Sequence, residues 1–217
     1  MAEVTGVGNA ASASGIGAID EGAGGRLIVL RHAKSAWPDG VADHERPLAG
    51  RGRRDAPAAG RRLFDTGCVP DLVVCSTARR ARETWHLVAT EMAPAEPDVV
   101  FEPRVYAASA SGLLRVLRDL AVLRRDAVSR EVVVGGGPER CRTVLLVGHQ
   151  PAVQELVLTL AGGGDEQALE RVRIKFPTSA FAVLTVPGTQ AGGGLAPGTA
   201  VLTDFAVPRG PAPDARG

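Results

Sequence analysis

Three short apolar runs along this chain end abruptly in polar or charged residues. They are residues 27–30, which precede Arg31 and His32; residues 72–75, which precede Ser76; and residues 144–147, which precede Gly148 and His149. Runs of this length between turn signals predict buried strands of a parallel sheet. The carboxyl ends of such strands face the crevice where open α/β sheets bind ligands. The pattern therefore predicts that the three polar ends meet along one edge of a sheet.

Apolar residues elsewhere recur at helical spacing. The spacing predicts helices through residues 56–64, 81–89, 113–120 and 153–160, the second capped by Ser76 or Thr77 and the last stopped by the glycines at 162–164. A further short strand is expected at 99–101, and residues 175–186 and 199–207 resemble a pair of strands at a sheet edge. Strands that alternate with helices in this way indicate an α/β fold.

The 217 residues suit one domain with a substantial core. We expect a disordered leader over residues 1–25, a folded domain over 26–207 and a frayed tail over 208–217, because both ends carry little bulky apolar surface. Residues 129–141 fit either a strand-like insertion or a flexible loop, and whether the glycine-rich stretches at 135–137 and 192–194 close over a ligand stays open.

The charge balance limits the possible partners. A formal net charge of +1 gives no overall field that would attract nucleic acid or a membrane surface, and the first 25 residues resemble neither a signal peptide nor an anchor. The three cysteines, Cys68, Cys75 and Cys141, are odd in number and form no Cys-x-x-Cys pair. This usage predicts a reducing cytoplasm and neither a disulfide framework nor a zinc site.

The arginines at the start of the second predicted helix point to an anion. Arg79, Arg80 and Arg82 stand at the positive end of the helix dipole, where cations are unfavourable unless an anion accompanies them. We expect one of the three to bind an anion, and Arg79 and Arg82 to face solvent.

Two histidines and two arginines can thus meet at the strand ends, and phosphoryl transfer suits them better than metal binding. No carboxylate or cysteine shows ligand spacing with either histidine, and arginines would repel a divalent cation. Guanidinium groups bind phosphoryl oxygens, and a neutral imidazole is a nucleophile near neutral pH. We expect His32 and His149 to be functional, whereas His44 and His86 fit ordinary core or surface roles. The prediction includes no metal and no cofactor.

At these residues the sequence resembles a known family. The segments that carry the resemblance are 31–35 (Arg-His-Ala-Lys-Ser), 46–48 (Arg-Pro-Leu), 80–84 (Arg-Ala-Arg-Glu-Thr) and 148–151 (Gly-His-Gln-Pro). In this order and spacing they are similar to the histidine phosphatase superfamily, and to its short SixA-like phosphohistidine phosphatase branch. The resemblance implies a phosphoglycerate-mutase-like fold, a three-layer α/β/α sandwich with a mostly parallel central sheet.

The resemblance also implies roles for single residues. His32 matches the histidine that becomes phosphorylated, and Arg31 and Arg80 match the arginines that hold the phosphoryl group. His149 matches the second pocket histidine, which donates to the transferring oxygens. The segment 176–180 is similar to one that lies near the pocket mouth, so Ser179 is a candidate phosphate contact, although it and Thr178 also suit the cap of an edge strand.

The sequence departs from the family at the general acid. Mutases and many sugar-phosphate phosphatases carry an acidic residue in mid-chain, and only Glu102 and Asp43 offer weak matches here. An alkoxide leaving group gains much from such an acid, whereas imidazole is far less basic. The absence therefore favours a phosphohistidine substrate. Alternatives are a broad phosphatase of sugar phosphates or nucleotides, and a phosphate-binding module without turnover. The physiological substrate and the oligomeric state stay open.

Overall fold

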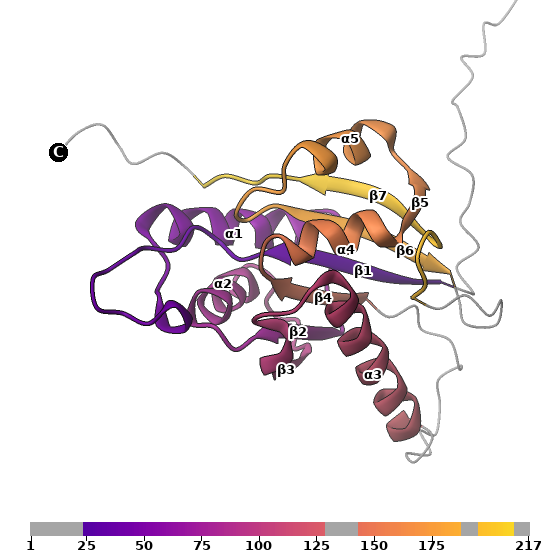
Figure 1. The fold of residues 1–217 in the computed structure, drawn as a ribbon, viewed down its shortest axis with the longest axis horizontal. Helices are drawn as coiled ribbons and strands as arrows, with labels where there is room; N and C mark the ends of the chain where they lie inside the picture. The colour runs from indigo at the N-terminus through magenta and orange to yellow at the C-terminus, as the bar shows by residue number, and fades with distance from the viewer. Residues whose placement is uncertain (1–23, 129–142, 188–194, 211–217) are drawn as a thin grey trace, which may run out of the picture.

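Strands and helices alternate through most of the fold, as the sequence predicts (Figure 1). The structure is a computed structural model that describes residues 24–128, 143–187 and 195–210. The strands are β1 (Gly24–Arg31), β2 (Leu72–Ser76), β3 (Asp98–Glu102), β4 (Thr143–Gly148), β5 (Ala161–Gly164), β6 (Phe181–Pro187) and β7 (Ala200–Ala206). The helices are α1 (Gly50–Asp65), α2 (Arg79–Ala89), α3 (Ala110–Val128), α4 (Ala152–Leu160) and α5 (Glu166–Ile174), with 3-10 turns η1 (Asp43–Glu45) and η2 (Pro103–Val105).

The seven described strands form one sheet in the order β3-β2-β4-β1-β6-β7-β5. Neighbours from β3 to β1 are parallel, β6 is antiparallel to both β1 and β7, and β5 is parallel to β7. The mostly parallel sheet expected from the sequence is confirmed. Because β1 and β4 lie in the middle and run the same way, their carboxyl ends emerge side by side.

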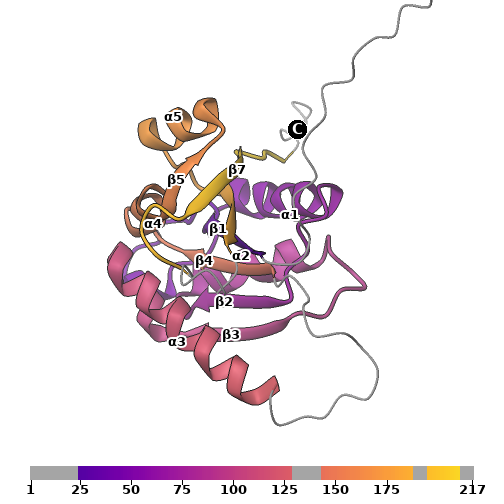
Figure 2. The same cartoon turned by 90° about the vertical axis from the view of Figure 1, so that its right-hand side faces the viewer.

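Helices cover both faces of the sheet (Figure 2). Along β1, Leu27 and Val29 pack into a core with α3, α4 and α5, whereas Ile28 and Leu30 pack into a second core with α1 and α2. Successive side chains of a strand point to opposite faces, so a continuous apolar run is what a sheet covered on both sides requires. This arrangement confirms the three-layer α/β/α sandwich.

The carboxyl-terminal part of the sheet differs from the prediction. The strands β6 and β7 do pair, but β5 covers β7, so the pair does not form the sheet edge. The glycines at 162–164 stop α4 and then form β5 itself. A Cβ at Gly162 would lie 1.9 Å from the Gly198 carbonyl oxygen, so the close approach of the two backbones requires glycine there. The helix α5 was not predicted, because Ala168 and Val172 are its only buried residues.

Some sequence predictions fall on residues outside the described ranges. These include most of the expected leader, the undecided segment at 129–141 and the end of the expected tail. Among the described residues, Cys68 and Cys75 are free and buried. None of the described helices is long and apolar enough to cross a membrane.

Candidate active site

The register between β1 and β4 brings the two strand-end histidines together. Arg31 is paired with Gly148 across the parallel strands, so His32 and His149 follow at the same level. The His32 N–H donates to the Gly148 carbonyl over 3.0 Å, and the two ring centroids lie 5.0 Å apart. The convergence expected from the apolar runs is therefore present.

His32 is held with one ring nitrogen ready to attack. The side chain is nearly buried, and Nδ1 lies 2.7 Å from the Ala33 carbonyl oxygen. A carbonyl oxygen only accepts, so Nδ1 carries the hydrogen and Nε2 keeps its lone pair. Burial, together with the nearby His149 and arginine charges, lowers the pKa of His32 to about 3. The ring is neutral at neutral pH.

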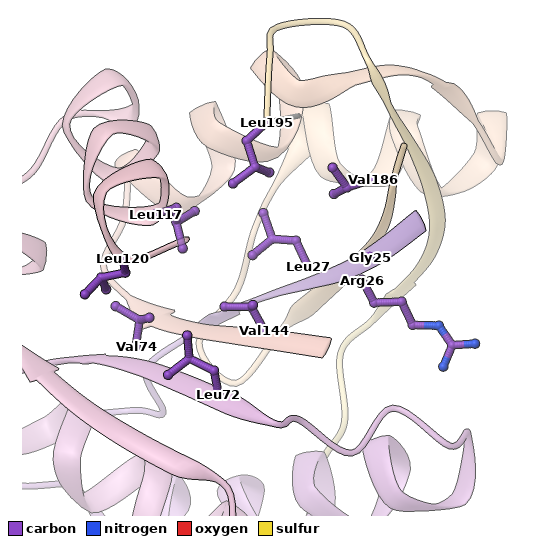
Figure 3. Close-up of a pocket in the computed structure, with 10 residues that line it drawn as sticks. All are labelled: Gly25, Arg26, Leu27, Leu72, Val74, Leu117, Leu120, Val144, Val186 and Leu195. Carbon is purple, nitrogen blue, oxygen red and sulfur yellow. The ribbon is translucent and has the colours of Figure 1, made fainter. Parts of the chain in front are cut away.

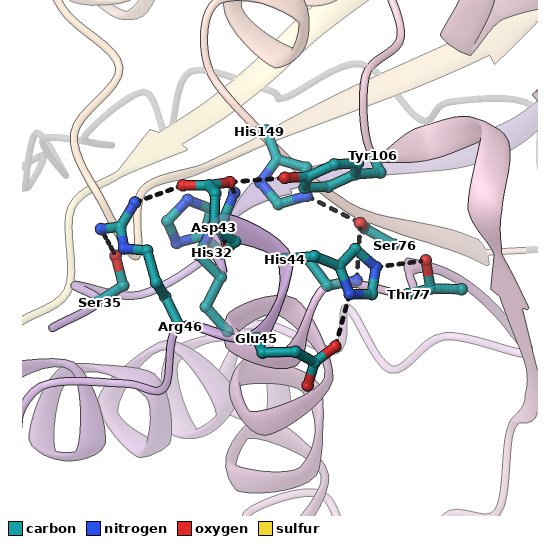
Figure 4. Close-up of polar contacts among 12 residues, drawn as sticks. His32, Ser35, Asp43, His44, Glu45, Arg46, Ser76, Thr77, Tyr106 and His149 are labelled. Carbon is teal, nitrogen blue, oxygen red and sulfur yellow. Dashed lines mark hydrogen bonds and ion pairs between the residues drawn. The ribbon is translucent and has the colours of Figure 1, made fainter. Parts of the chain in front are cut away.

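His149 uses the opposite ring nitrogen (Figure 4). Its Nε2 lies 2.8 Å from the Ser76 hydroxyl oxygen, which also accepts from the Ala78 N–H. Among the described residues Nε2 is the acceptor within reach of the hydroxyl hydrogen, and a donor directed at Nε2 places the imidazole hydrogen on Nδ1. That Nδ1 is buried and has no partner within the described ranges. Burial and the charge of Arg80 lower the pKa of His149 to about 4, which keeps this ring neutral as well.

Arg80 is the arginine at the start of α2 that lies in the site. It is 7% exposed and binds Asp43 twice, through the Asp43 carbonyl oxygen at 2.6 Å and the carboxylate Oδ2 at 3.0 Å. Arg79 is exposed and paired with Glu83, as expected of a surface residue. The cap prediction was wrong, because the residue before α2 is Ala78, which makes no side-chain cap bond.

Contacts from both helices of one layer hold the loop after β1. The Thr84 hydroxyl of α2 accepts from the Ala33 N–H over 2.9 Å and donates to the Arg80 carbonyl over 2.6 Å. In α1, a Cβ at Gly52 would lie 2.2 Å from the Lys34 carbonyl oxygen, so only glycine permits this approach. His32 and Arg80 are consequently tied to one rigid frame.

Arg31 and Ser179 lie on the other side of the nucleophile strand. Arg31 donates from Nη1 to the Phe176 carbonyl over 2.8 Å, and burial lowers its pKa. The Ser179 N–H donates to the Arg31 carbonyl over 3.2 Å, and the residue is buried with φ of 64°. Arg31 Nε and Ser179 Oγ are buried and lack partners among the residues described. Buried polar atoms are normally hydrogen-bonded, so these two, like His149 Nδ1, are candidates to bind a ligand.

The two carboxylates considered as general acids are both held as anions. Glu102 accepts three hydrogen bonds from Arg104, which lower its pKa, and no described contact joins it to the histidines. Asp43 accepts from Tyr106, Arg46 and Arg80, and these donors hold its pKa far below the usual range. The structure brings Asp43 to the site and leaves Glu102 outside it.

Sequence reasoning missed several neighbours of the site. His44, for which an ordinary core or surface role was expected, shares a hydrogen bond of 3.0 Å between its Nε2 and the Thr77 hydroxyl. Its ring packs edge-on against Tyr106, with the ring centroids 4.8 Å apart. Tyr106 in turn packs edge-on against His149 at 5.6 Å. The sequence predicts Ser76 at the sheet edge and as a helix cap, but not as the hydrogen-bond partner of His149. These residues come from three separate segments, and no periodicity in the sequence connects them.

Neither a cluster of metal ligands nor the apolar cavity of the described chain offers a rival site for phosphate chemistry. No group of three or more histidine, cysteine, aspartate or glutamate side chains is arranged there as metal ligands. An apolar cavity of about 140 Å³ lies toward the amino-terminal ends of the central strands (Figure 3), whereas His32 follows the carboxyl end of β1. Aliphatic side chains such as Leu27, Leu72 and Leu117 line it. Its charged lining residue, Arg26, points away from the leucines in Figure 3 and donates to the Gly67 carbonyl, so the cavity presents no polar group to a phosphate.

Comparison with known proteins identifies the family. The family model described as histidine phosphatase superfamily (branch 1) matches residues 27–104. An uncharacterised protein of Mycobacterium tuberculosis is 41% identical over 182 residues, which cover 83% of this chain and all of the relative. The chain belongs to the histidine phosphatase superfamily. It is accordingly a phosphatase, and the superfamily predicted from four short segments is confirmed.

Solved structures place this histidine phosphatase in the SixA-like branch. A protein of Agrobacterium tumefaciens assigned as the phosphohistidine phosphatase SixA is 25% identical, with a TM-score of 0.62 over 85% of this chain and 99% of that one. A protein of Nakamurella multipartitia with the same assignment is 27% identical, with a TM-score of 0.61 over 87% of this chain and 99% of that one. The predicted fold and branch agree with both.

Proposed function

We propose that this phosphatase works through a covalent phosphohistidine formed on His32. The observation that carries the proposal is the hydrogen bond from Nδ1 to the Ala33 carbonyl at 2.7 Å, which leaves the Nε2 lone pair free in a neutral ring. Neutral imidazole is an effective nucleophile toward phosphorus. A protonated ring would have no lone pair to offer.

The phosphoryl group would be held by Arg31, Arg80, His149 and Ser179. Three of these residues carry buried atoms without partners among the described residues: Arg31 Nε, His149 Nδ1 and Ser179 Oγ. The guanidinium groups match the charge of the phosphoryl oxygens, and the neutral His149 N–H adds a donor without adding a charge. Donors that are fixed before the substrate arrives need no reorganisation in the transition state.

The reaction would proceed in two in-line displacements. His32 Nε2 attacks phosphorus, and the bond to the leaving group breaks with its electron pair on that group. Water then attacks the phosphohistidine, the P–N bond breaks, and its electron pair returns to Nε2. The protons of the water stay with the released phosphate or pass to solvent. No cofactor takes part in either step.

The leaving-group side favours a protein phosphohistidine as the substrate. Both candidate acids, Asp43 and Glu102, are held as carboxylates by their partners and have lowered pKa values. A site without a ready acid is poorly suited to an alkoxide, and better suited to imidazole. The SixA assignments of the two similar structures support the same substrate class.

The test is to trap the phosphoenzyme. Enzyme mixed with a ³²P-labelled phosphohistidine peptide and quenched in alkaline detergent should carry label that is stable to alkali and labile to acid. His32→Ala should carry none, and His86→Ala, which removes an exposed histidine remote from the site, should keep it. Label that persists in His32→Ala excludes the assignment. Faster turnover of sugar phosphates than of the peptide would instead favour the broad small-molecule phosphatase. Phosphate binding without product would indicate a binding module.

We also propose that the protein is cytoplasmic. The free, buried thiols of Cys68 and Cys75 support a reducing compartment, since such thiols need no disulfide to complete the fold. Fractionation of the native cells with an antibody to the chain tests this location.

A further inference from the structure

Among the described residues, Asp43 is the carboxylate that binds Arg80, one of the residues proposed to hold the phosphoryl group, and Figure 4 shows it between Arg46 and Tyr106. Its Oδ2 accepts from Arg80 Nη2 at 3.0 Å and from the Tyr106 hydroxyl at 2.6 Å, and its Oδ1 accepts from Arg46 Nη1 at 2.7 Å. The Asp43 side chain is 50% exposed, whereas that of Arg80 is 9% exposed. Asp43 therefore lies on the solvent side of Arg80, where a substrate must arrive.

One acceptor position of this carboxylate is still available. Each carboxylate oxygen can accept two hydrogen bonds, and among the described residues Oδ1 accepts only the one from Arg46. The donors from Arg46, Arg80 and Tyr106 hold the group ionised. The other titratable side chains around it are His149 beyond Tyr106, and His44 and Glu45 in the same turn. Asp43 consequently presents a fixed negative charge with a free acceptor toward solvent.

This charge is a disadvantage for most phosphate esters. It repels a phosphoryl dianion at Arg80, and it repels any leaving group that departs as an anion. A leaving group that carries a positive charge and an N–H reverses the effect, because it binds the carboxylate. An N-phosphorylated imidazole that is protonated on its other nitrogen has both properties.

We propose that Asp43 selects phosphohistidine substrates by accepting a hydrogen bond from the protonated, non-phosphorylated nitrogen of the leaving imidazole. This inference rests on the proposed function and specifies its leaving-group side. The ring is protonated before the reaction. When His32 Nε2 forms its bond to phosphorus, the bond between phosphorus and the substrate nitrogen breaks, and the electron pair remains on that nitrogen. The product is neutral imidazole, which keeps its proton on the other nitrogen.

The selection explains why the site needs no general acid. An unprotonated phosphoimidazole would have to leave as an imidazolide anion, which is a far stronger base than imidazole. Asp43 stabilises the protonated ring through a charge-assisted hydrogen bond, so the substrate brings the proton that an acid would otherwise supply. Asp43 is ionised and cannot serve as a general acid, but as an anion it accepts the hydrogen bond from the protonated leaving ring.

The decisive experiment compares Asp43→Asn with wild type on two substrates. Asparagine keeps an oxygen that can accept from Arg80 and Tyr106, and the bond from Arg80 to the backbone carbonyl of residue 43 remains. We expect kcat/KM for a phosphohistidine peptide to fall by about tenfold more than kcat/KM for p-nitrophenyl phosphate, whose leaving group has no N–H. An equal fall for both substrates would mean that Asp43 only positions Arg80, and would overturn the proposal.

The pH profile gives a readout that a positioning role would not move. With the peptide, the rate should decline at high pH as the leaving ring loses its proton, and Asp43→Asn should shift this decline to lower pH by about one unit. With p-nitrophenyl phosphate the same limb should not move. His44→Gln, which removes the adjacent titratable ring, should keep the wild-type limb. An unmoved limb in Asp43→Asn overturns the proposal.

The outcomes separate this inference from the proposed function. If wild type turns over neither substrate, or labels no histidine, both fail. If wild type hydrolyses p-nitrophenyl phosphate through His32 but not the peptide, the phosphatase mechanism stands and the selection by Asp43 is overturned. Tyr106→Phe is the matched control, since it removes one donor to Asp43 and keeps both the ring and the charge. It should change the ratio of the two substrates less than Asp43→Asn does.

Discussion

At the end of β1 the ring of His32 binds a backbone carbonyl through Nδ1, whereas at the end of β4 the ring of His149 binds a hydroxyl through Nε2. Both histidines follow apolar strands at the same level of a parallel pair, both are nearly buried, and both have lowered pKa values. The strands thus place two similar rings side by side. The hydrogen-bond partner of each ring then determines which nitrogen is left for the substrate.

This difference assigns opposite chemistry to the two rings. Under the proposed function His32 offers a lone pair from Nε2, and His149 offers an N–H from Nδ1. The assignment can be tested by amide substitutions, because the asparagine amide nitrogen lies near the position of histidine Nδ1 and that of glutamine near Nε2. Neither amide is a nucleophile.

The largest effect is expected at His32. We expect both His32→Asn and His32→Gln to reduce kcat by about 10³-fold or more, because neither amide has a lone pair that can attack phosphorus, although asparagine can keep the bond to Ala33. Steady-state turnover of a phosphohistidine peptide measures the loss. Substantial activity in either variant would remove the distinction between the two rings.

A smaller and asymmetric effect is expected at His149. His149→Asn should keep a donor near Nδ1 and lose about tenfold in kcat, whereas His149→Gln should lose about 10²- to 10³-fold, as expected for removal of a donor to the transferring oxygens. The two variants are matched in charge and chemistry and differ only in reach. Equal losses, or a reversed order, would contradict the tautomer inferred from Ser76.

The effect of Ser76 should be no larger than that of His149→Asn, since Ser76 acts only through His149. Ser76→Ala removes the hydrogen bond to Nε2, so the ring is no longer confined to one tautomer or orientation. We expect kcat to fall by about tenfold, with mixed His149 tautomers in ¹⁵N NMR spectra. Thr77→Ala removes the next hydroxyl, which contacts His44, and serves as the control. A single unchanged tautomer in Ser76→Ala would show that another group fixes the ring.

The same comparison shows how far the sequence could be interpreted. The proximity of His32 and His149 was predictable, because two apolar runs of a parallel sheet bring equivalent ends to one edge. Which nitrogen of each ring faces the substrate was not predictable, because it depends on the contacts with Ala33 and Ser76, and these contacts follow from side-chain rotamers. Arg80 was distinguished from its neighbours only by the family motif, and in the structure it is the buried one of the three arginines Arg79, Arg80 and Arg82.

Loops and short elements were the least predictable. Asp43 and Tyr106 are 63 residues apart and meet through a hydroxyl–carboxylate bond that no periodic pattern records. The glycines of β5 signalled a helix stop, and their second role appears only when the β7 backbone lies against them. Local patterns therefore predicted the layers of the fold, whereas the solvent side of the candidate site needed the structure.

The smallest difference between the two histidines should appear in stability. A histidine whose pKa is lower in the folded state than its ordinary 6.5 is neutral in the fold, while the unfolded chain takes up its proton as the pH falls. Stability should therefore be fully present above pH 6.5 and decline below it, until the pH reaches the folded pKa. That point is about 4 for His149 and about 3 for His32, so the decline due to His32 extends further. Each proton lowers the free energy of unfolding by at most about 1.4 kcal/mol per pH unit.

Urea unfolding between neutral pH and the acid limit should show a shallower decline of the free energy of unfolding in His149→Asn and the shallowest in His32→Asn, because asparagine does not titrate. Identical slopes in the two variants and wild type would mean that both rings take up protons at their ordinary pKa in the fold, and the lowered pKa of His32 and His149 would then be excluded.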